Sequence, residues 1–152
     1  MTSPVTPESD AAARSSFDAA RFFEMARHVG HTRALDLEYV ASGEDWMELS
    51  IDWRQELVGI PESGILASGA IVSLIDTASG GSIWTRLGHF RPMATVDLRI
   101  DYFRPALKGQ RVFARCDCTK ITSQIAFVRG IAHVGDREDP IAHSAGTFML
   151  LD

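Results

Sequence analysis

The sequence predicts an α+β fold in which a curved antiparallel sheet wraps around one long central helix. The first observation is a stretch over residues 69–87 that is long enough for a helix and carries one charge, Asp76, between Gly69 and Ile83. The second is the alternation of apolar and polar residues in two segments before this stretch and four after it. A helix that is apolar on all sides must be covered, and an antiparallel sheet with one apolar face can cover it. The 152 residues, 45% of them hydrophobic, are enough to bury such a core.

The start of the chain predicts a tail and a short helix. Residues 1–13 are rich in Ser, Thr and Pro, so we expect a flexible tail there and a single domain over residues 14–152. A short helix is predicted over residues 15–30, because apolar side chains gather on one side and Gly30 can end it. The residues of this apolar side are Phe22, Phe23, Met25, Ala26 and Val29.

Two alternating segments, residues 34–42 and 45–53, are separated by Gly43 and Glu44 and predict a β-hairpin. In the second segment one face is apolar, and we expect the opposite face to contact solvent. The apolar face holds Met47, Leu49, Ile51 and Trp53, and the opposite face holds Trp46, Glu48, Ser50 and Asp52.

Four further strands are predicted after the central helix, over residues 93–103, 110–121, 123–134 and 140–151. In the first of these, one set of alternating residues is expected to face the helix. This set is Val96, Leu98, Ile100 and Tyr102. Small residues in the helix are expected to let the sheet approach its backbone closely. They are Gly69, Ala70, Ala78, Gly80 and Gly81.

Composition limits the classes of partner. A net charge of −5, from 15 basic and 20 acidic residues, argues against nucleic acid and anionic membranes as partners. The sequence has no run of 18 apolar residues and begins without a secretory signal, so we expect a cytoplasmic protein that does not enter a membrane. Cys116 and Cys118 share one face of a predicted strand and are expected to be reduced, half-buried thiols. The five histidines form no set with carboxylates or thiols at metal-ligand spacing, so no metal site is predicted.

Asp76 is the feature of the central helix that requires explanation. A buried carboxylate is costly unless it is hydrogen-bonded, paired or open to a cleft. On a helix, Asp76 is expected to share a polar stripe with Ser73 and Ser79, near the free N–H groups at Gly69. One interpretation is a structural carboxylate that bonds neighbouring hydroxyls or a loop amide. The other is a nucleophile or general base, two helical turns from donors that could stabilise an oxyanion, an arrangement that suits acyl-group hydrolysis.

Two sequence segments favour the catalytic interpretation. The segment GILASGAIVSLIDTASGGSIW, followed by MATVDLRIDYFRPALKGQ, resembles the hotdog-fold thioesterases of the phenylacetate-degradation and 4-hydroxybenzoyl-CoA thioesterase-like kind. The resemblance covers roughly residues 34–151. It implies the hotdog fold, a curved antiparallel sheet around one long helix, which agrees with the element order predicted from the residues. It also implies an acyl-CoA thioesterase that releases a free acid and coenzyme A.

The resemblance also implies roles for individual residues. Asp76 matches the catalytic carboxylate, which acts as base or nucleophile, and Thr95 matches a hydroxyl residue that orients the water or substrate. The backbone N–H of Ser68, with Gly69 beside it, matches the group that polarises the thioester carbonyl. This chain departs from the family where H-G-G is usual, because Ala67 stands in place of the histidine and Ser68 in place of one glycine.

The implied assembly is a homodimer or a dimer of dimers with active sites at subunit interfaces. If Val96, Leu98 and Ile100 face the chain's own helix, Thr95 lies on the opposite face of its strand. We therefore expect Thr95 to reach the Asp76 of a partner chain rather than its own.

Coenzyme A enters these expectations as part of the substrate, and no cofactor is predicted. Arg91, Arg104 and Lys108, with Arg86 nearby in the sequence, are candidates for binding its phosphates. The alternative function is a non-catalytic acyl-CoA or small-ligand binder on the same fold, which the missing histidine favours.

Overall fold

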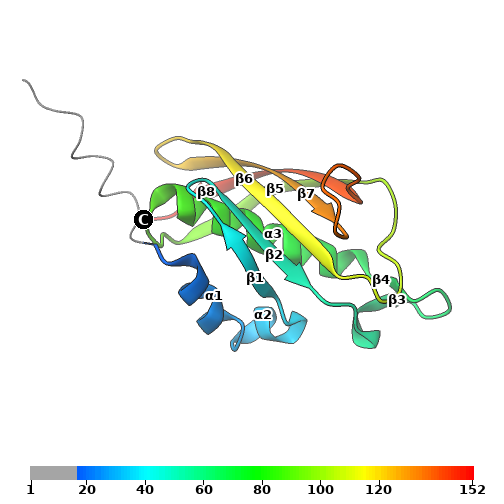
Figure 1. Ribbon diagram of the computed structural model, residues 1–152. Helices are drawn as coiled ribbons and strands as arrows, with labels where there is room; N and C mark the ends of the chain where they lie inside the picture. The colour runs from blue at the N-terminus through cyan, green and yellow to red at the C-terminus, as the bar shows by residue number, and fades with distance from the viewer. Residues whose placement is uncertain (1–16) are drawn as a thin grey trace, which may run out of the picture.

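The computed structural model of the chain describes residues 17–152, so the tail predicted over residues 1–13 lies outside the described residues. Three helices, a 3₁₀ turn and two antiparallel sheets make up this part of the chain (Figure 1). In chain order they are α1 (Ala19–Ala26), α2 (Gly30–Leu35), β1 (Glu38–Ser42), β2 (Trp46–Ile51), the 3₁₀ turn η2 (Gln55–Leu57), β3 (Val58–Ile60), β4 (Ile65–Leu66), α3 (Ser68–Leu87), β5 (Met93–Tyr102), β6 (Val112–Ile121), β7 (Ile125–His133) and β8 (Ala142–Leu150).

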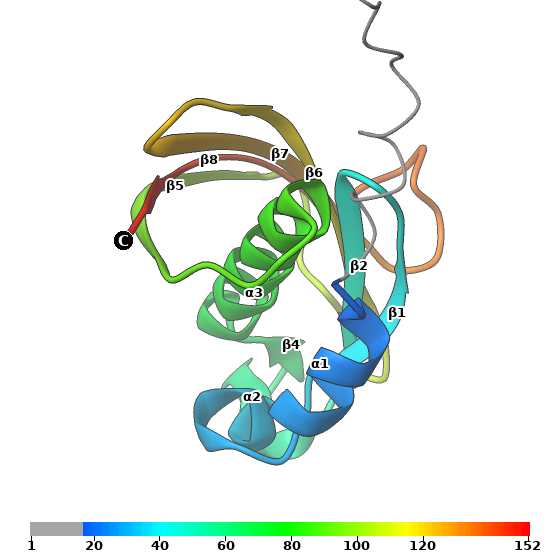
Figure 2. The same cartoon turned by 90° about the vertical axis from the view of Figure 1, so that its left-hand side faces the viewer.

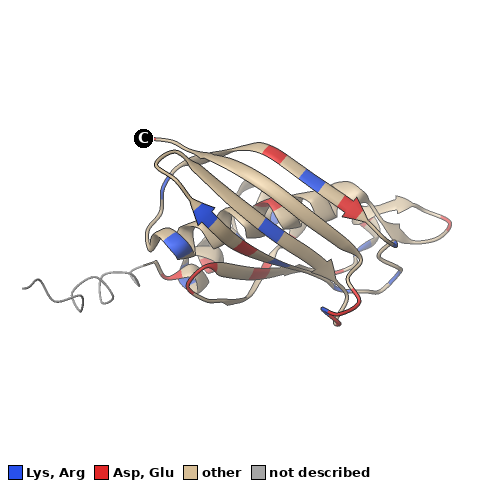
Figure 3. Cartoon of the chain, turned by 90° about the horizontal axis from the view of Figure 1, so that it is seen from above, with Lys and Arg blue, Asp and Glu red and all other residues tan. Residues whose placement is uncertain are grey.

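The main sheet is antiparallel throughout and has the strand order β1-β2-β6-β7-β8-β5. It curves around α3, as Figure 2 shows from the end of the helix. The predicted α+β class, with a curved sheet around a long central helix, is confirmed. β5 lies at an edge of the sheet, and its outward positions carry alternating acidic and basic residues (Figure 3). Among residues 17–152, no helix combines the length and apolar character needed to cross a bilayer.

The central helix α3 spans nearly the residues predicted for it. It ends at Gly88, which adopts the left-handed conformation at φ 74° that favours glycine. Ten of its residues are buried, most of them in the middle of the helix. Gly81 is where the sheet comes closest, because a Cβ there would lie 2.1 Å from Met47 Sδ. The expectation that the sheet also approaches Gly69 closely is wrong. Gly69 is exposed and a Cβ there would lie in open space, because Gly69 is on the exposed side of the first turn, whereas Ala70 and Ile71 are buried.

The N-terminal part of the domain differs from the prediction. The single helix expected up to Gly30 is two helices, and Gly30 begins the second rather than ending the first. The Asp18 carboxylate caps α1 by accepting a hydrogen bond from Arg21 N at 3.0 Å. The strand expected from residue 34 begins at Glu38, because Asp36 ends α2 in a left-handed conformation at φ 52°. The short pair β3 and β4 was not predicted, since strands of two or three residues carry too little alternation to detect.

The second face of β2 is buried at Glu48 and Ser50, which contradicts the expectation that it contacts solvent there, whereas Asp52, just after the strand, is exposed as predicted. Glu48 is 4% exposed and Ser50 is fully buried. The loop after β7 folds over this face, where Arg137 donates a hydrogen bond to Glu48 at 2.7 Å and His133 Nε2 lies 3.6 Å from the same carboxylate. Burial is also the main cause that lowers the pKa of His133. A contact between residues about 90 positions apart leaves no trace in local alternation.

The two cysteines are free, as predicted, and both are fully buried rather than half-buried. Burial raises the pKa of the Cys116 thiol to about 12 and that of Cys118 to about 11. Both side chains are therefore neutral apolar groups in the core.

The adjacent glycines of α3 offer a paired test of this packing. A Cβ at Gly80 would meet only Met93 Sδ, at 3.7 Å, whereas a Cβ at Gly81 would overlap the buried Met47. We expect Gly80→Ala to raise the free energy of unfolding by about 0.5–1 kcal/mol, since alanine is the better helix former. Gly81→Ala should instead lower it by about 1–3 kcal/mol through overpacking. Chemical denaturation of both variants measures the difference, and equal stability would contradict the close approach at Gly81.

Candidate active site

Asp76 lies in the middle of α3 on the side that β5 passes, and its side chain is half-buried. Thr95 Oγ1 donates a hydrogen bond to Asp76 Oδ1, with 2.8 Å between the two oxygens. Both residues belong to the same chain, so the expectation that Thr95 must reach the Asp76 of a partner is wrong. Within residues 17–152, no donor bonds the second carboxylate oxygen, Oδ2.

A β-bulge explains why Thr95 faces its own helix. In the pairing of β5 with β8, Thr95 is opposite Phe148 and Asp97 is opposite Thr147, which leaves Val96 as an extra residue. One extra residue shifts the alternation by one, so odd-numbered side chains such as Thr95 face inward before the bulge and even-numbered ones such as Leu98 face inward after it. Thr95 therefore faces α3, and Val96 is 58% exposed rather than inward as expected. Beyond the bulge, Leu98 and Ile100 pack against the core as predicted.

The predicted polar stripe on α3 is divided. Ser79 is fully buried, whereas Ser73 lies at the surface with its Oγ 3.0 Å from His31 Nε2. Residues three apart fall short of a full helical turn by about 60°, so Ser73 and Ser79 lie about 120° apart around the helix. Asp76, between them in sequence, lines a cavity.

The cavity beside Asp76 has a volume of about 480 Å³. Polar groups line one part of it, namely those of Asp76, Thr77, Thr95 and Thr32. The remaining wall is apolar and largely aromatic, and it is formed by Phe22, Phe23, Ala26, Gly80, Trp84, Phe90, Pro92, Met93 and Phe148. Helices α1 and α2 thus contribute to a site that the sequence assigned to α3 and β5. The aromatic residues of α1 were predicted only as an apolar helix side, because nothing local indicates which element that side covers.

The predicted backbone donors lie at the first turn of α3. The N–H groups of Ser68 and Gly69 have no acceptor among the residues that the structure describes, whereas the next one, of Ala70, bonds the carbonyl of Ala67. Ala67 precedes the helix without a side-chain cap. Ser68 lines a second cavity of about 530 Å³, where Tyr102 donates to the Ser68 carbonyl oxygen at 3.4 Å. Burial raises the pKa of Tyr102, so it is a neutral donor there.

Within one chain, these donors and the carboxylate do not meet. Ser68 and Asp76 are eight residues apart, or about 12 Å along the helix axis. They line different cavities. A carbonyl under attack needs oxyanion donors and a base each within about 3 Å. The structure therefore brings Asp76 together with Thr95 but leaves Ser68 and Gly69 at a separate position.

Of the candidate phosphate ligands, Arg104 and Lys108 lie near the first turn of α3. Arg104 lines the cavity beside Ser68 and is ion-paired with Asp139 at 2.8 Å. Lys108 packs against Gly64, and its Nζ lies 5.8 Å from the centre of the Trp53 ring. Arg91 follows the other end of α3, where it donates to the Leu151 carbonyl at 3.0 Å and pairs with Asp152.

Comparison with known proteins gives three kinds of match. Residues 63–141 match the family described as the thioesterase superfamily. A protein of Salmonella typhimurium described as a medium/long-chain acyl-CoA thioesterase, YigI, is 30% identical over 136 residues, which are 81% of this chain and 86% of that protein.

Solved structures show the same fold. A protein from Pseudomonas aeruginosa is 38% identical, with a TM-score of 0.75 over 88% of this chain and 96% of that one. The PaaI protein of the Escherichia coli phenylacetic acid degradation operon is 16% identical, with a TM-score of 0.75 over 91% and 97% of the two chains. At that identity the PaaI match shows the fold alone, which is the hotdog fold that the sequence predicts.

Proposed function

The chain belongs to the thioesterase superfamily, and we propose that this thioester hydrolase cleaves acyl-CoA to a free acid and coenzyme A in a site built by two copies of the chain. The observation that carries the proposal is the Asp76 carboxylate, which Thr95 holds at the polar end of an apolar cavity. The described activity of the Salmonella relative supports acyl-CoA as the substrate class.

The geometry at Asp76 gives its two carboxylate oxygens different roles. Oδ1 accepts the Thr95 hydroxyl, and no donor among residues 17–152 bonds Oδ2, so Oδ2 is the oxygen that we assign to the reaction. As a base, Oδ2 takes a proton from water while the water oxygen bonds the carbonyl carbon. The carbon–sulfur bond then breaks and the sulfur receives that proton, which gives the acid and the free thiol. As a nucleophile, Oδ2 bonds the carbonyl carbon, the carbon–sulfur bond breaks and coenzyme A leaves as its thiolate. Water then hydrolyses the acyl–aspartyl anhydride, which releases the acid and regenerates the Asp76 carboxylate, and the thiolate takes the proton that the water gives up.

The oxyanion formed in either route needs donors, and the free N–H groups of Ser68 and Gly69 in the described chain lie about 12 Å from Asp76 along the helix axis. In the proposed dimer, two antiparallel copies of α3 bring the Ser68 and Gly69 N–H groups of one chain to the Asp76 of the other. Val72 is midway between Ser68 and Asp76 in sequence and is 38% exposed, as expected for a residue beside the two-fold axis. The unpaired edge of β5 and the exposed Val96 extend this surface.

Coenzyme A would enter beside the donors. Arg104 and Lys108 lie near the first turn of α3 and can meet its phosphates through guanidinium and ammonium groups. Arg91 lies beyond the opposite end of the helix and has partners in the C-terminal residues. The proposed phosphate site therefore uses Arg104 and Lys108.

Replacing Asp76 tests the proposed chemistry. Asp76→Asn keeps the shape of the side chain but removes its basic oxygen, so we expect kcat to fall by about 10²–10⁴ with an unchanged melting temperature. Thiol release from a series of acyl-CoA esters measures the rate. Asp45→Asn, in the exposed β1–β2 turn, is the matched control. A native protein that binds these esters without turnover would instead support the non-catalytic binder.

Replacing Thr95 tests whether its hydroxyl positions the carboxylate. Thr95→Val keeps the branched shape and removes the donor, and we expect kcat to fall about tenfold or more, with a smaller change in KM. Thr95→Ser retains the donor and should restore most of the rate. Equal activity of the valine and serine variants would contradict this role.

Mixing two inactive variants tests the shared site. Ser68→Pro removes the backbone N–H at the first helical position, which tolerates proline, and Ala67 already has the extended conformation that precedes proline, at φ −62° and ψ 135°. Ser68→Ala keeps the N–H and is the control. Ser68→Pro and Asp76→Asn should each be inactive alone. Random mixing should restore about one quarter of native activity, because half of the dimers are mixed and one of their two sites is intact. If donors and carboxylate act within one chain, mixing restores nothing.

A further inference from the structure

We propose that the acyl tail of the substrate lies in the cavity beside Asp76, between α3 and α1, and that Gly80 and an aromatic cluster limit it to roughly eight to ten carbons. The aromatic cluster consists of Phe22, Trp84 and Phe90. This inference rests on the proposed thioesterase function and deepens it by naming the substrate class.

The polarity of the cavity gives the direction of the tail. Asp76, Gly80 and Trp84 are spaced four residues apart and line one side of the cavity along α3. The Asp76 end is polar and would hold the reacting carbonyl, whereas the Trp84 end is aromatic. Trp84 Nε1 donates to the Arg91 carbonyl at 2.8 Å, so the Trp84 indole N–H already has its partner. The far end thus favours an apolar tail over a polar one.

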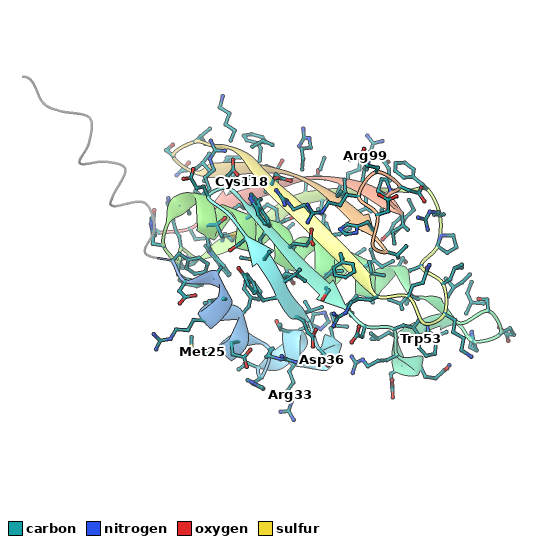
Figure 4. All side chains as sticks on the ribbon, in the orientation of Figure 1. Met25, Arg33, Asp36, Trp53, Arg99 and Cys118 are labelled. Atoms are coloured by element: carbon teal, nitrogen blue, oxygen red, sulfur yellow. The ribbon has the colours of Figure 1, made fainter. Side chains whose placement is uncertain are left out.

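The far end is closed by rings from three segments of the chain. The ring of Phe22 in α1 lies 4.9 Å from that of Trp84 in α3, and the ring of Phe90, between α3 and β5, lies 5.0 Å from Trp84. Phe22 lines the cavity. Met25, on the same helix, points outward and is 58% exposed (Figure 4). Helix α1 lies outside residues 63–141, the part that matches the family, so this wall is formed by a segment beyond the common domain.

The length of acyl tail that the cavity can hold follows from the geometry of α3. Asp76 and Trp84 are about 12 Å apart along the helix axis. An extended chain advances about 3.5 Å for every three bonds, so this span takes roughly ten bonds. Gly80 lies halfway, and a Cβ there would meet only Met93 Sδ, at 3.7 Å, so a larger side chain would extend into the cavity.

The experiment compares kcat/KM for butyryl-, octanoyl- and dodecanoyl-CoA in the native protein and in Gly80→Ala and Gly80→Leu. We expect the native protein to favour octanoyl over the other two. Gly80→Leu should lower the octanoyl-to-butyryl ratio by roughly ten- to a hundredfold, and Gly80→Ala by less. A ratio that Gly80→Leu leaves unchanged, in a folded and active protein, overturns the tail site while the thioesterase function stands. A native protein that hydrolyses none of the three esters overturns both.

A second pair of variants tests the closed end. Phe22→Ala should open it and raise the dodecanoyl-to-octanoyl ratio severalfold. Phe17→Ala is the matched control, because Phe17 contacts the rings of Phe22 and Trp84 but does not line the cavity, so the ratio should not change. Thermal melting of both variants measures the loss of packing that they share. Equal changes of the ratio in both variants would overturn the assignment of Phe22 as the end wall.

Discussion

The cost of a carboxylate within a core helix is the constraint on which the rest of this site depends. Helix α3 buries apolar residues around most of its middle, so a charged group there must lie where hydrogen bonds or water can reach it. Asp76 lies where the sheet does not cover the helix, between β5 and the N-terminal helices. Thr95 supplies the hydrogen bond and the cavity supplies the access. The same opening that makes the carboxylate tolerable also makes it available to a substrate.

The parts of this arrangement that could be predicted from the sequence are those that follow from local pattern. The uncharged stretch around Asp76 predicted α3 to within one residue, and the period of two predicted the six long strands to within a few. The bulge at Val96 could not be predicted, because a single extra residue is visible only in the pairing of β5 with β8. The bulge places Thr95 on the face of β5 opposite to the one predicted. Thr95 therefore bonds the Asp76 of its own chain rather than that of a partner.

Contacts between distant segments account for the remaining differences. The apolar side of α1 was visible, but its position over Trp84 depends on the path of the chain through α2 and β1. The burial of Glu48 depends likewise on a loop that follows β7. For α1 the residue types indicated a buried side but not its partner, and for Glu48 they indicated exposure that the structure contradicts, since alternation and helical period describe a face without describing what covers it.

The first turn of α3 illustrates how stability and donor capacity oppose each other. A helix usually gains about 1 kcal/mol when a Ser, Thr, Asp or Asn side chain at its N-cap accepts one of the first free N–H groups. Ala67 occupies the N-cap here and offers no such acceptor. The N–H groups of Ser68 and Gly69 therefore keep their full capacity to bond a developing oxyanion, aided by the positive end of the helix dipole. Because a backbone N–H belongs to every residue except proline, this capacity does not require a histidine at position 67. What the turn requires of its side chains is that they leave the amides unoccupied, and alanine, serine and glycine meet that requirement.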